Sequence, residues 1–286
     1  MANSVWYDDR ISAATQFMES HWNKPIQLAD IADAAAISPY HFHRVFKAIT
    51  GQRVKEVLTR IRLGKAAHQL KFSNDDIAAI AEATGYQNHE TFSRAFKDYF
   101  GQSPSEYRSA IRQQTELRQR YLNEIKIEQQ LGIGDPSIKT IAPLQVAYLR
   151  HTGSYDHVAT TWRKLMLWSV RKLLFRLNAV TLGIVHDDPY LTESDNIRFD
   201  ACLVVSKPFK EKDDVNYKVV DGGKYAVFRF KGGYDKMYAV YDYIYNVCVF
   251  RHQFKLDHRP AFEWYVKSPP FHKPSEFVTD FYIPIQ

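Results

Sequence analysis

The spacing of apolar and polar residues predicts two pairs of short helices in the first part of the chain. One amphipathic stretch begins at Leu28 and another at Ile77, and each breaks after a few residues. The pattern restarts at Ser38-Pro39 and at Asn88, which suit the beginning of a helix because a side-chain oxygen can accept from its first N–H groups. The second helix of each pair then carries one apolar stripe, formed by Phe42, Val45, Phe46 and Ile49 and by Phe92, Ala95, Phe96 and Tyr99.

The two helix pairs are copies of one unit. Several residues return 50 positions later: Phe42, Arg44, Phe46, Lys47, Gly51 and Gln52 recur as Phe92, Arg94, Phe96, Lys97, Gly101 and Gln102. Away from its apolar stripe, each second helix carries basic and short polar side chains. This layout is typical of a helix-turn-helix unit whose second helix reads the major groove of DNA. The alternative is an ordinary helical hairpin with a solvated outer face.

A single amphipathic helix is predicted over Val54 to Lys71, between the two pairs. Its apolar residues are expected near the buried side: Val57, Leu58, Ile61, Ala66 and Leu70. At about 1.5 Å per residue this helix spans roughly 27 Å. It can therefore hold two recognition helices near one turn of DNA apart, about 34 Å.

The charge of the chain becomes informative when it is read by position. The 286 residues carry a formal net charge of +6 with a pI near 9.1, which admits an anionic partner without choosing one. Residues 44–71, however, hold eight basic side chains against the single acid Glu56, a local charge of +7. This concentration favours contacts with DNA phosphates along the first recognition helix and the connecting helix.

Composition excludes several other classes of protein. Hydrophobic residues make up 45% of the chain and charged residues 24%, which suits two folded domains and excludes a disordered chain. The two cysteines, Cys202 and Cys248, do not form a disulfide framework, and the histidines lack metal-ligand spacing. Neither an export signal nor an apolar run long enough to cross a membrane is visible. We expect a cytoplasmic protein with no membrane contact, no metal and no cofactor.

A different, strand-like pattern begins near residue 122, and it also repeats. Residues 199–286 hold 20 of the 41 aromatic side chains, as a β-rich core requires. Residues 146–156 match 225–235 at an offset of 79, and residues 183–189 and 200–205 match 263–269 and 280–285 at an offset of 80. Each copy is interpreted as a strand, a helix and two further strands. The pattern predicts an α+β domain with a pseudo-twofold axis and a groove along it.

One position breaks the symmetry of this second repeat. Where the second copy has Glu263 among apolar residues, the first copy has Gly183, which offers only space. A buried carboxylate without a partner is costly, so Glu263 is expected to raise its pKa or to receive a cation or a hydrogen-bond donor. Phe262, Trp264 and Tyr265 can supply apolar walls and cation–π contacts. The alternative is a glutamate on an edge strand that faces water.

The first half of the chain resembles the AraC/XylS family of bacterial transcription regulators over about residues 8–111. The resemblance rests on the duplicated helix pair, the Gly-Gln pairs and a signature in the second copy: Ala81, Gly85, Tyr86, Phe92, Arg94, Phe96, Lys97, Gly101, Pro104 and Tyr107. It implies an all-α domain of two helix-turn-helix units. It also implies binding to double-stranded DNA and, for an activator, a contact with RNA polymerase.

The same resemblance assigns the DNA contacts by position. Base contacts fall on Tyr40, His43 and Arg44 of the first recognition helix and on Glu90, Thr91 and Arg94 of the second. Arginine can bind guanine through two hydrogen bonds, whereas glutamate can accept from cytosine or repel phosphate, which makes the second helix the less certain reader. Phosphate contacts are expected from Ser38, Lys47, Arg53, Asn88 and Lys97.

The second half resembles the GyrI-like effector-binding domain over about residues 122–286. The matching features are residues 147–155, Trp162, Trp168, Asp187-Asp188-Pro189, residues 262–265 and residues 279–285. In that family the glutamate at the position of Glu263 lies in an aromatic groove and receives amphipathic, often cationic, ligands. The resemblance implies a ligand site formed by Tyr148, Trp162, Trp168, Glu263, Trp264 and Tyr265. Behind an AraC-type reader, this domain looks like that of the Rob-like subgroup, where it senses small molecules or shields the activator.

The sequence therefore predicts a multidomain protein. Residues 1–112 are assigned to DNA binding, 113–121 to a linker, and 122–286 to small-molecule binding. The leading interpretation is a transcription activator, not an enzyme, that is modulated by an amphipathic or cationic molecule. Two alternatives stay open. A hydrolase could use Glu263 as general base with Tyr148 or Tyr265 as its donor, and the second domain could instead bind a protein partner.

Overall fold

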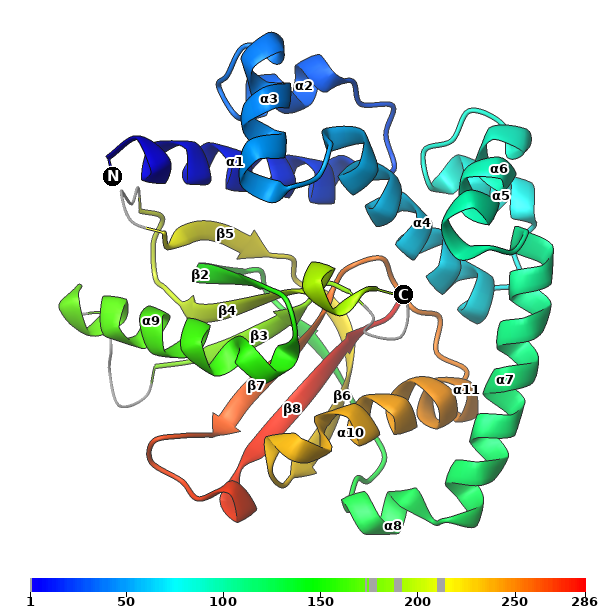
Figure 1. The fold of residues 1–286 in the computed structure, drawn as a ribbon. Helices are drawn as coiled ribbons and strands as arrows, with labels where there is room; N and C mark the ends of the chain where they lie inside the picture. The colour runs from blue at the N-terminus through cyan, green and yellow to red at the C-terminus, as the bar shows by residue number, and fades with distance from the viewer. Residues whose placement is uncertain (1, 173, 175–178, 188–191, 210–213) are drawn as a thin grey trace. The chain divides into compact units, whose positions relative to one another are not determined.

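The computed structural model describes residues 2–172, 174, 179–187, 192–209 and 214–286. The chain divides into two compact units at a point within helix α7 (Pro104–Glu124). Unit 1 holds the described residues up to 114 together with Asp214, and unit 2 holds the other described residues from 115 onward. The linker predicted at residues 113–121 therefore lies inside a helix. Figure 1 shows the helical first part in blue and cyan and the sheet-containing part from green to red.

The described part of unit 1 is helical. Its elements are α1 (Ala2–His21), α2 (Leu28–Ala34), α3 (Pro39–Thr50), α4 (Val54–Phe72), α5 (Ile77–Ala83), α6 (His89–Phe100) and the first half of α7. The two helix-turn-helix units, α2–α3 and α5–α6, and the connecting helix α4 are thus confirmed. Gly51 and Gly101 end α3 and α6 with φ of +72° and +74°, a left-handed conformation that glycine adopts without strain.

The apolar stripes of the recognition helices pack in their centres but not at their ends. Phe42 and Phe46 of α3 are fully buried, as are the equivalent phenylalanines of α6. Ile49 and Tyr99 are 41% and 42% exposed, so their predicted burial is wrong. The partner helices α2 and α5 have 7 residues each against 12 in α3 and α6, which makes them too short to cover the last turn.

Helix α4 forms the centre of unit 1. Its predicted buried residues are buried, and Leu63, Ala67 and Gln69 are buried as well. These additional residues follow from the position of α4, which contacts α3 on one side and α5 and α6 on the other. A helix that serves both helix-turn-helix units has to bury more than one face.

Arg62 of α4 holds the backbone together rather than contributing a solvent-exposed charge. Its guanidinium donates to the carbonyl oxygens of Trp22 and Lys24, at 2.7 Å in each case. Burial lowers the pKa of Arg62 against the opposite effect of Tyr86. Arg62 therefore ties α4 to the end of α1, and its charge has to be removed from the predicted basic surface.

Replacing Arg62 by Ala is expected to lower the free energy of unfolding of unit 1 by about 2 kcal/mol, because two carbonyl groups lose charge-assisted donors. Lys55→Ala is the matched control, since Lys55 lies on the same helix with an exposed side chain. It should change stability by less than about 0.5 kcal/mol. Urea unfolding followed by far-ultraviolet circular dichroism compares the two variants, and equal losses would contradict this role of Arg62.

Unit 2 is an α+β unit whose described residues form one antiparallel sheet of eight strands. In sheet order the strands are β1 (Ser137–Ile141), β6 (Gly223–Lys231), β8 (Val278–Pro284), β7 (Ala261–Lys267), β3 (Thr181–Val185), β4 (Arg198–Val204), β2 (Leu144–Thr152) and β5 (Asn216–Val220). Under the repeat, β2, β3 and β4 correspond to β6, β7 and β8. The equivalent strands β3 and β7 pair at the centre, so a pseudo-twofold axis passes between them. The predicted fold class is confirmed.

The first strand of each half pairs with the other half. β1 precedes β2 in sequence but pairs with β6, and β5 precedes β6 but pairs with β2. Only residues 142–143 separate β1 from β2, so the two edges of the sheet have to meet at this corner. A β-carbon at Gly222 would lie 2.6 Å from the carbonyl oxygen of Ile141, which shows how closely the chain segments approach there. The sheet is therefore strongly curled.

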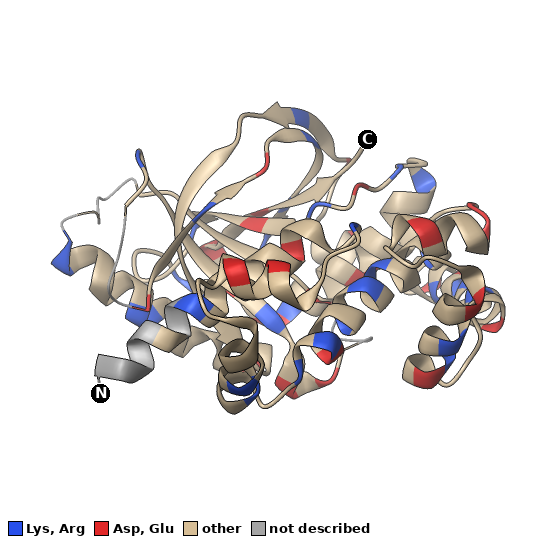
Figure 2. Cartoon of the chain, turned by 90° about the horizontal axis from the view of Figure 1, so that it is seen from above, with Lys and Arg blue, Asp and Glu red and all other residues tan. Residues whose placement is uncertain are grey.

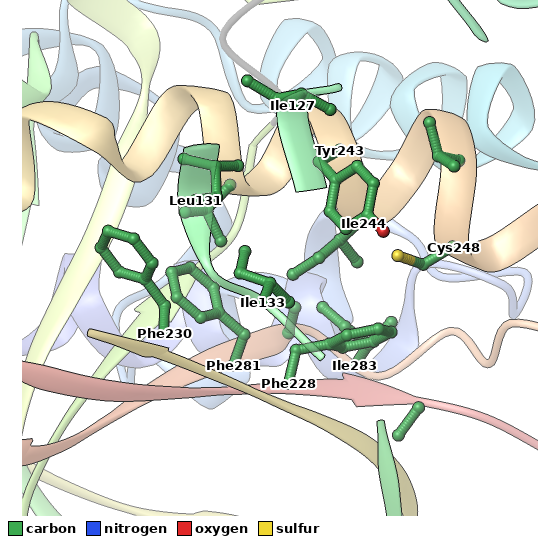
Figure 3. Packing of buried hydrophobic residues seen from close by; sticks show 14 of the residues in the cluster. Ile127, Leu131, Ile133, Phe228, Phe230, Tyr243, Ile244, Cys248, Phe281 and Ile283 are labelled. Carbon is green, nitrogen blue, oxygen red and sulfur yellow. The ribbon is translucent and has the colours of Figure 1, made fainter. Parts of the chain in front are cut away.

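Two helices cover the same face of this sheet (Figure 1). α9 (Val158–Arg171) packs on β2 and β4 of the first half. α10 (Met237–Tyr243) continues into a π-helical turn (Ile244–Cys248) and α11 (Val249–Arg251), and packs with α8 (Ile127–Leu131) over β6 and β8 (Figure 3). The opposite face carries its own apolar cluster, which includes Tyr148, Tyr225 and Phe262. Among the described residues, no helix is both apolar and long enough to cross a lipid bilayer.

Candidate DNA-binding surface and effector site

The residues predicted to contact DNA bases lie exposed on the two recognition helices. Tyr40 of α3 is 73% exposed. The others are also exposed: His43 and Arg44 on α3, and Glu90, Thr91 and Arg94 on α6. Because each helix is anchored by its buried phenylalanines, these side chains are held on the outer surface of unit 1. Their contacts with DNA stay a prediction.

The predicted phosphate-contacting residues are exposed too, and one of them has a second role. Asn88 caps α6, since its side-chain oxygen accepts from the backbone N–H of Thr91 at 2.8 Å. Ser38 makes no such cap bond, so the predicted capping is confirmed only at Asn88. At α3 the fixed φ of Pro39 starts the helix instead. The remaining members of this set, Lys47, Arg53 and Lys97, are exposed.

Basic residues are spread along the helices rather than gathered in one block. Figure 2 shows Lys and Arg interleaved with Asp and Glu along the ribbon. Of the basic side chains between residues 44 and 71, Arg62 binds backbone carbonyl groups and Lys65 lies over the ring of Trp22, 5.9 Å from its centroid. Those that are exposed are Arg44, Lys47, Arg53 and Lys55. The predicted +7 surface is therefore reduced to α3 and the start of α4.

Glu263 is buried in β7 and accepts hydrogen bonds from two tyrosines. Its exposed fraction is 6%. Tyr241 of α10 donates to Oε1 at 3.0 Å, and Tyr265, two residues further along β7, donates to Oε2. The alternative of an edge-strand glutamate facing water is wrong, because β7 is an interior strand paired with β3 and β8.

Aromatic rings from several elements surround this carboxyl group. The ring of Tyr265 contacts Trp162 of α9 and Tyr234, which precedes α10, with centroid distances of 5.3 and 5.8 Å. Trp162 also contacts Phe199 of β4 at 6.3 Å. Tyr234 is 39% exposed, so the group extends from solvent to the buried carboxyl. We name it the Glu263 cluster: Glu263, Tyr241, Tyr265, Tyr234, Trp162 and Phe199.

Burial changes the ionisation of the Glu263 cluster. Loss of solvent raises the pKa of Glu263 to about 7, against the opposite effect of the hydrogen bonds from Tyr265 and Tyr241. Burial, with a smaller effect of the Glu263 charge, also raises the pKa of Tyr234. The carboxyl group is therefore poised between its neutral and charged forms near neutral pH. A cation placed beside it would favour the charged form.

Gly183 lets the first half of unit 2 close over Glu263. A β-carbon there would lie 2.4 Å from Cζ of Phe199 and 2.6 Å from the hydroxyl oxygen of Tyr265. The sequence indicated empty space opposite Glu263, but these two rings fill it. The asymmetry between Gly183 and Glu263 therefore allows one carboxyl group to be enclosed by aromatic side chains from both halves.

Three residues of the predicted ligand set lie elsewhere. Trp264 and Tyr148 belong to the cluster on the opposite face of the sheet. Trp168 is buried between α9 and the sheet, where its ring lies 5.5 Å from that of Phe209. Of the predicted set, the structure brings together Glu263, Tyr265 and Trp162.

Three residues of the Glu263 cluster are not predicted from the sequence: Tyr241, Tyr234 and Phe199. Tyr234 had a signal in the sequence, since it follows the repeated glycine segment at the position equivalent to Tyr155. Tyr241 had none, because residues 234–245 contain five tyrosines and the sequence alone does not tell which of them reaches Glu263.

A buried ionic cluster lies on the opposite face of the first half. Asp200 of β4 is fully buried and accepts from Arg150 of β2 at 2.7 and 2.9 Å and from Lys218 of β5. Nε2 of His186 lies 2.7 Å from Oδ2 of Asp200. Burial by itself would raise the pKa of Asp200, but the charges of Arg150, Lys218 and His186 hold it well below its ordinary value.

The predicted motif Asp187-Asp188-Pro189 follows β3. Asp187 accepts from the guanidinium of Arg198 at 2.6 and 2.7 Å, which ties this segment to the start of β4. Asp188 and Pro189 lie outside the described residues.

Comparisons with known proteins match both units. Residues 31–110 match a helix-turn-helix domain family, and residues 134–286 match the GyrI-like small molecule binding domain. The Right origin-binding protein of Escherichia coli (strain K12) is 25% identical over 232 residues, 76% of each chain. The multiple antibiotic resistance protein MarA of Salmonella typhimurium is 30% identical over 98 residues, 34% of this chain and 77% of that protein. The chain belongs to the AraC-type transcription regulators with a C-terminal GyrI-like domain.

As an AraC-type regulator of this layout, the protein binds DNA and controls transcription. The Transcriptional regulator Rob of Salmonella typhimurium is 25% identical over 231 residues, which are 76% of each chain, so the similarity extends over both matched domains of this protein. These relatives are regulators rather than enzymes, so the hydrolase alternative is not supported.

Proposed function

We propose that this AraC-type regulator is an activator that reads DNA with α3 and α6 and binds a lipophilic cation at the Glu263 cluster. One observation carries the ligand assignment. A buried carboxyl group accepts hydrogen bonds from tyrosines rather than from Lys or Arg, and aromatic rings surround it. A cation with apolar substituents satisfies both features, because the carboxylate supplies the charge and the rings supply cation–π contacts. As an activator, the protein would also contact RNA polymerase near its binding site.

The DNA part of this proposal rests on the exposed polar faces of α3 and α6. The first recognition helix is expected to discriminate more strongly, because Arg44 can bind guanine through two hydrogen bonds, whereas Glu90 of the second also repels phosphate. Glu90 does, however, suit a cytosine amino group. The phosphate contacts hold the register of the two helices and carry no sequence information.

Arg44→Ala is expected to weaken binding to a duplex selected in vitro by the full-length chain by about 1–3 kcal/mol and to relax the choice of one base pair. Lys47→Ala is the matched control, because Lys47 lies on the same exposed helix but is assigned to phosphate. Lys47→Ala should lower the affinity for all duplexes by the same factor. It should also reduce the salt dependence of the DNA affinity by the equivalent of about one phosphate contact. If Arg44→Ala left both affinity and base preference unchanged, the assignment of the first reader would be wrong.

Tetraphenylphosphonium, a permanently charged lipophilic cation, provides the test of the ligand site. It is expected to change the tryptophan fluorescence through Trp162, and Glu263→Gln should weaken its binding at least about tenfold by removing the charge. Glu124→Gln, an exposed glutamate of unit 2, serves as the control and should bind as the wild type does. Cholate, an anionic amphiphile, should bind more weakly than the cation. Equal binding of both compounds, with no effect of Glu263→Gln, would exclude a cation site here.

A further inference from the structure

We propose that α10 couples the Glu263 cluster to α7, the helix that continues into the DNA-binding unit. This inference rests on the proposed effector site and concerns how its occupation is transmitted. It is carried by neighbouring residues of α10: one binds the carboxyl group of Glu263, and the next binds α7.

The two contacts of α10 leave from adjacent residues. Tyr241 donates to Glu263 at 3.0 Å. Asp242, 7% exposed, accepts from Nε of Arg118 at 2.8 Å and also from its Nη2. Consecutive residues of a helix are rigidly related, so a rotation or shift of α10 that withdraws Tyr241 from Glu263 also moves Asp242 away from its place beside Arg118.

Arg118 lies in the second half of α7, and the first half of the same helix supports a recognition helix. In unit 1 the ring of Tyr107 lies 5.3 and 5.2 Å from those of Phe96 and Phe100 of α6. Arg112 donates to the carbonyl oxygen of Ser73 at 3.1 Å. α7 is one continuous helix from Pro104 to Glu124, so it links the support of α6 to the ion pair with Asp242.

The turn between α7 and α8 also rests on the α10–α11 segment. Glu128 of α8 accepts from Arg251 of α11 at 2.9 Å. Ile127 and Leu131 share an apolar cluster with Tyr243 (Figure 3). A surface pocket of about 260 Å³ is lined by Tyr243 and by residues of this turn: Leu122, Asn123, Lys126, Ile127, Glu128 and Gln129.

The π-helical turn that follows α10 is the part of this segment whose conversion would change the helix register. A π-helical turn contains one residue more than an α-helical turn, so its conversion changes the register of the helix. Asn246 of this turn donates to the carboxylate of Asp242 at 2.7 Å and to its carbonyl oxygen at 3.1 Å. The residue that binds Arg118 is thus also bound to the element that can change register. An element with two discrete arrangements is what coupling between separate sites requires.

A cation at the Glu263 cluster would compete with Tyr241 for the carboxylate. Once the Tyr241 hydroxyl is released, α10 is no longer held in its present register, and the ion pair between Asp242 and Arg118 weakens. The second half of α7 is then no longer held by α10. Occupation of the cluster is therefore expected to loosen α7 and to change the affinity for DNA.

Hydrogen exchange of the full-length protein tests the coupling without a ligand. Tyr241→Phe, which removes the hydroxyl group that binds Glu263, should accelerate amide exchange in residues 115–124 at least about threefold. Asp280→Asn is the matched control: Arg229 binds Asp280 at 2.7 Å, and their exposed fractions of 64% and 5% resemble the 44% and 7% of Arg118 and Asp242. It should leave residues 115–124 unchanged. Faster exchange confined to α10, with residues 115–124 as in the wild type, would overturn the proposal.

A second measurement uses the selected duplex and tetraphenylphosphonium. The cation should change the DNA affinity of the wild type by about fivefold. Asp242→Asn should abolish this response while binding the cation within about twofold of the wild type, and Asp280→Asn should retain the response. Arg118→Gln, at the more exposed end of the pair, gives an independent variant if Asp242→Asn folds poorly.

These outcomes separate the two proposals. A full DNA response in both Asp242→Asn and Arg118→Gln would overturn the coupling while leaving the ligand site intact. If the wild type did not bind the cation, the proposed ligand class would fail, and the exchange measurement alone would decide the coupling.

Discussion

Asp200→Asn is expected to lower the free energy of unfolding of unit 2 by about 3–5 kcal/mol, because it removes the anion from a buried ionic cluster. The side chains of Arg150 and Lys218 are only 18% and 10% exposed, and Asp200 is fully buried. Without the carboxylate, two buried cations lie close together with His186 beside them. Such a change is more destabilising than the loss of an exposed pair, which contributes about 1 kcal/mol or less.

The pseudo-twofold axis supplies the control for this prediction. Asp280 occupies the equivalent position in the second half and accepts two hydrogen bonds of 2.7 Å from Arg229. The Arg229 side chain is 64% exposed, so its charge returns to water when the partner is lost. Asp280→Asn should therefore cost about 1 kcal/mol. Urea unfolding monitored through the tryptophans of unit 2 compares the two variants. If both variants lost the same free energy of unfolding, burial of the cations would not explain the destabilisation by Asp200→Asn.

The same cluster predicts a dependence on pH. Because the pKa of Asp200 lies below its value in the unfolded chain, its ionised form stabilises the folded state. This contribution is complete above the unfolded pKa, near 4, and is lost as the pH falls through the lower folded pKa. Asp200→Asn should remove that part of the acid sensitivity, whereas Asp280→Asn should retain it.

The repeats made most of the fold predictable. Each structural unit occurs twice in the sequence. The structure predicted around Phe42 is therefore supported by the same pattern around Phe92, and the helix end predicted at Gly51 by that at Gly101. The pairing of β1 and β5 with the opposite half of the sheet could not be predicted from the repeats. Both are short strands outside the matched segments, and their pairing depends on contacts distant in sequence rather than on local pattern.

Within the candidate site, the sequence predicts only those side chains whose direction follows from their position along a strand. Tyr265 is two residues from Glu263 in one strand, so both side chains face the same side. Trp264 lies between them in the strand and therefore has to face the other side, which contradicts its predicted place in the ligand set. Tyr241 comes from a helix whose orientation over the sheet is set by tertiary packing. The sequence places Arg62 among the surface charges because it does not reveal the carbonyl groups that Arg62 binds.

Glu263→Gln is expected to remove a pH dependence that the wild type shows near neutrality. The pKa of Glu263 is raised from 4.5 to about 7 by burial, so its protonated form stabilises the folded state. That stability is complete below the unfolded pKa and is lost as the pH rises toward 7, with a total on the order of 3 kcal/mol. Glutamine is neutral throughout, so the variant should unfold at nearly constant free energy over this range and should be the more stable protein at pH 8.

Cation binding should follow the opposite course, because only the ionised carboxyl group attracts the ligand. Tetraphenylphosphonium carries a charge that does not titrate. Burial raises the pKa of Tyr241 and Tyr265 well above its ordinary value, so both remain neutral. The affinity of the wild type should therefore rise about tenfold between pH 6 and pH 8 as Glu263 loses its proton, while that of Glu263→Gln stays low and constant. Ionised Glu263 therefore lowers the stability of the folded state at the same pH values at which it binds the cation most tightly. A wild-type affinity independent of pH over this interval would mean that Glu263 does not carry the ligand's counter-charge.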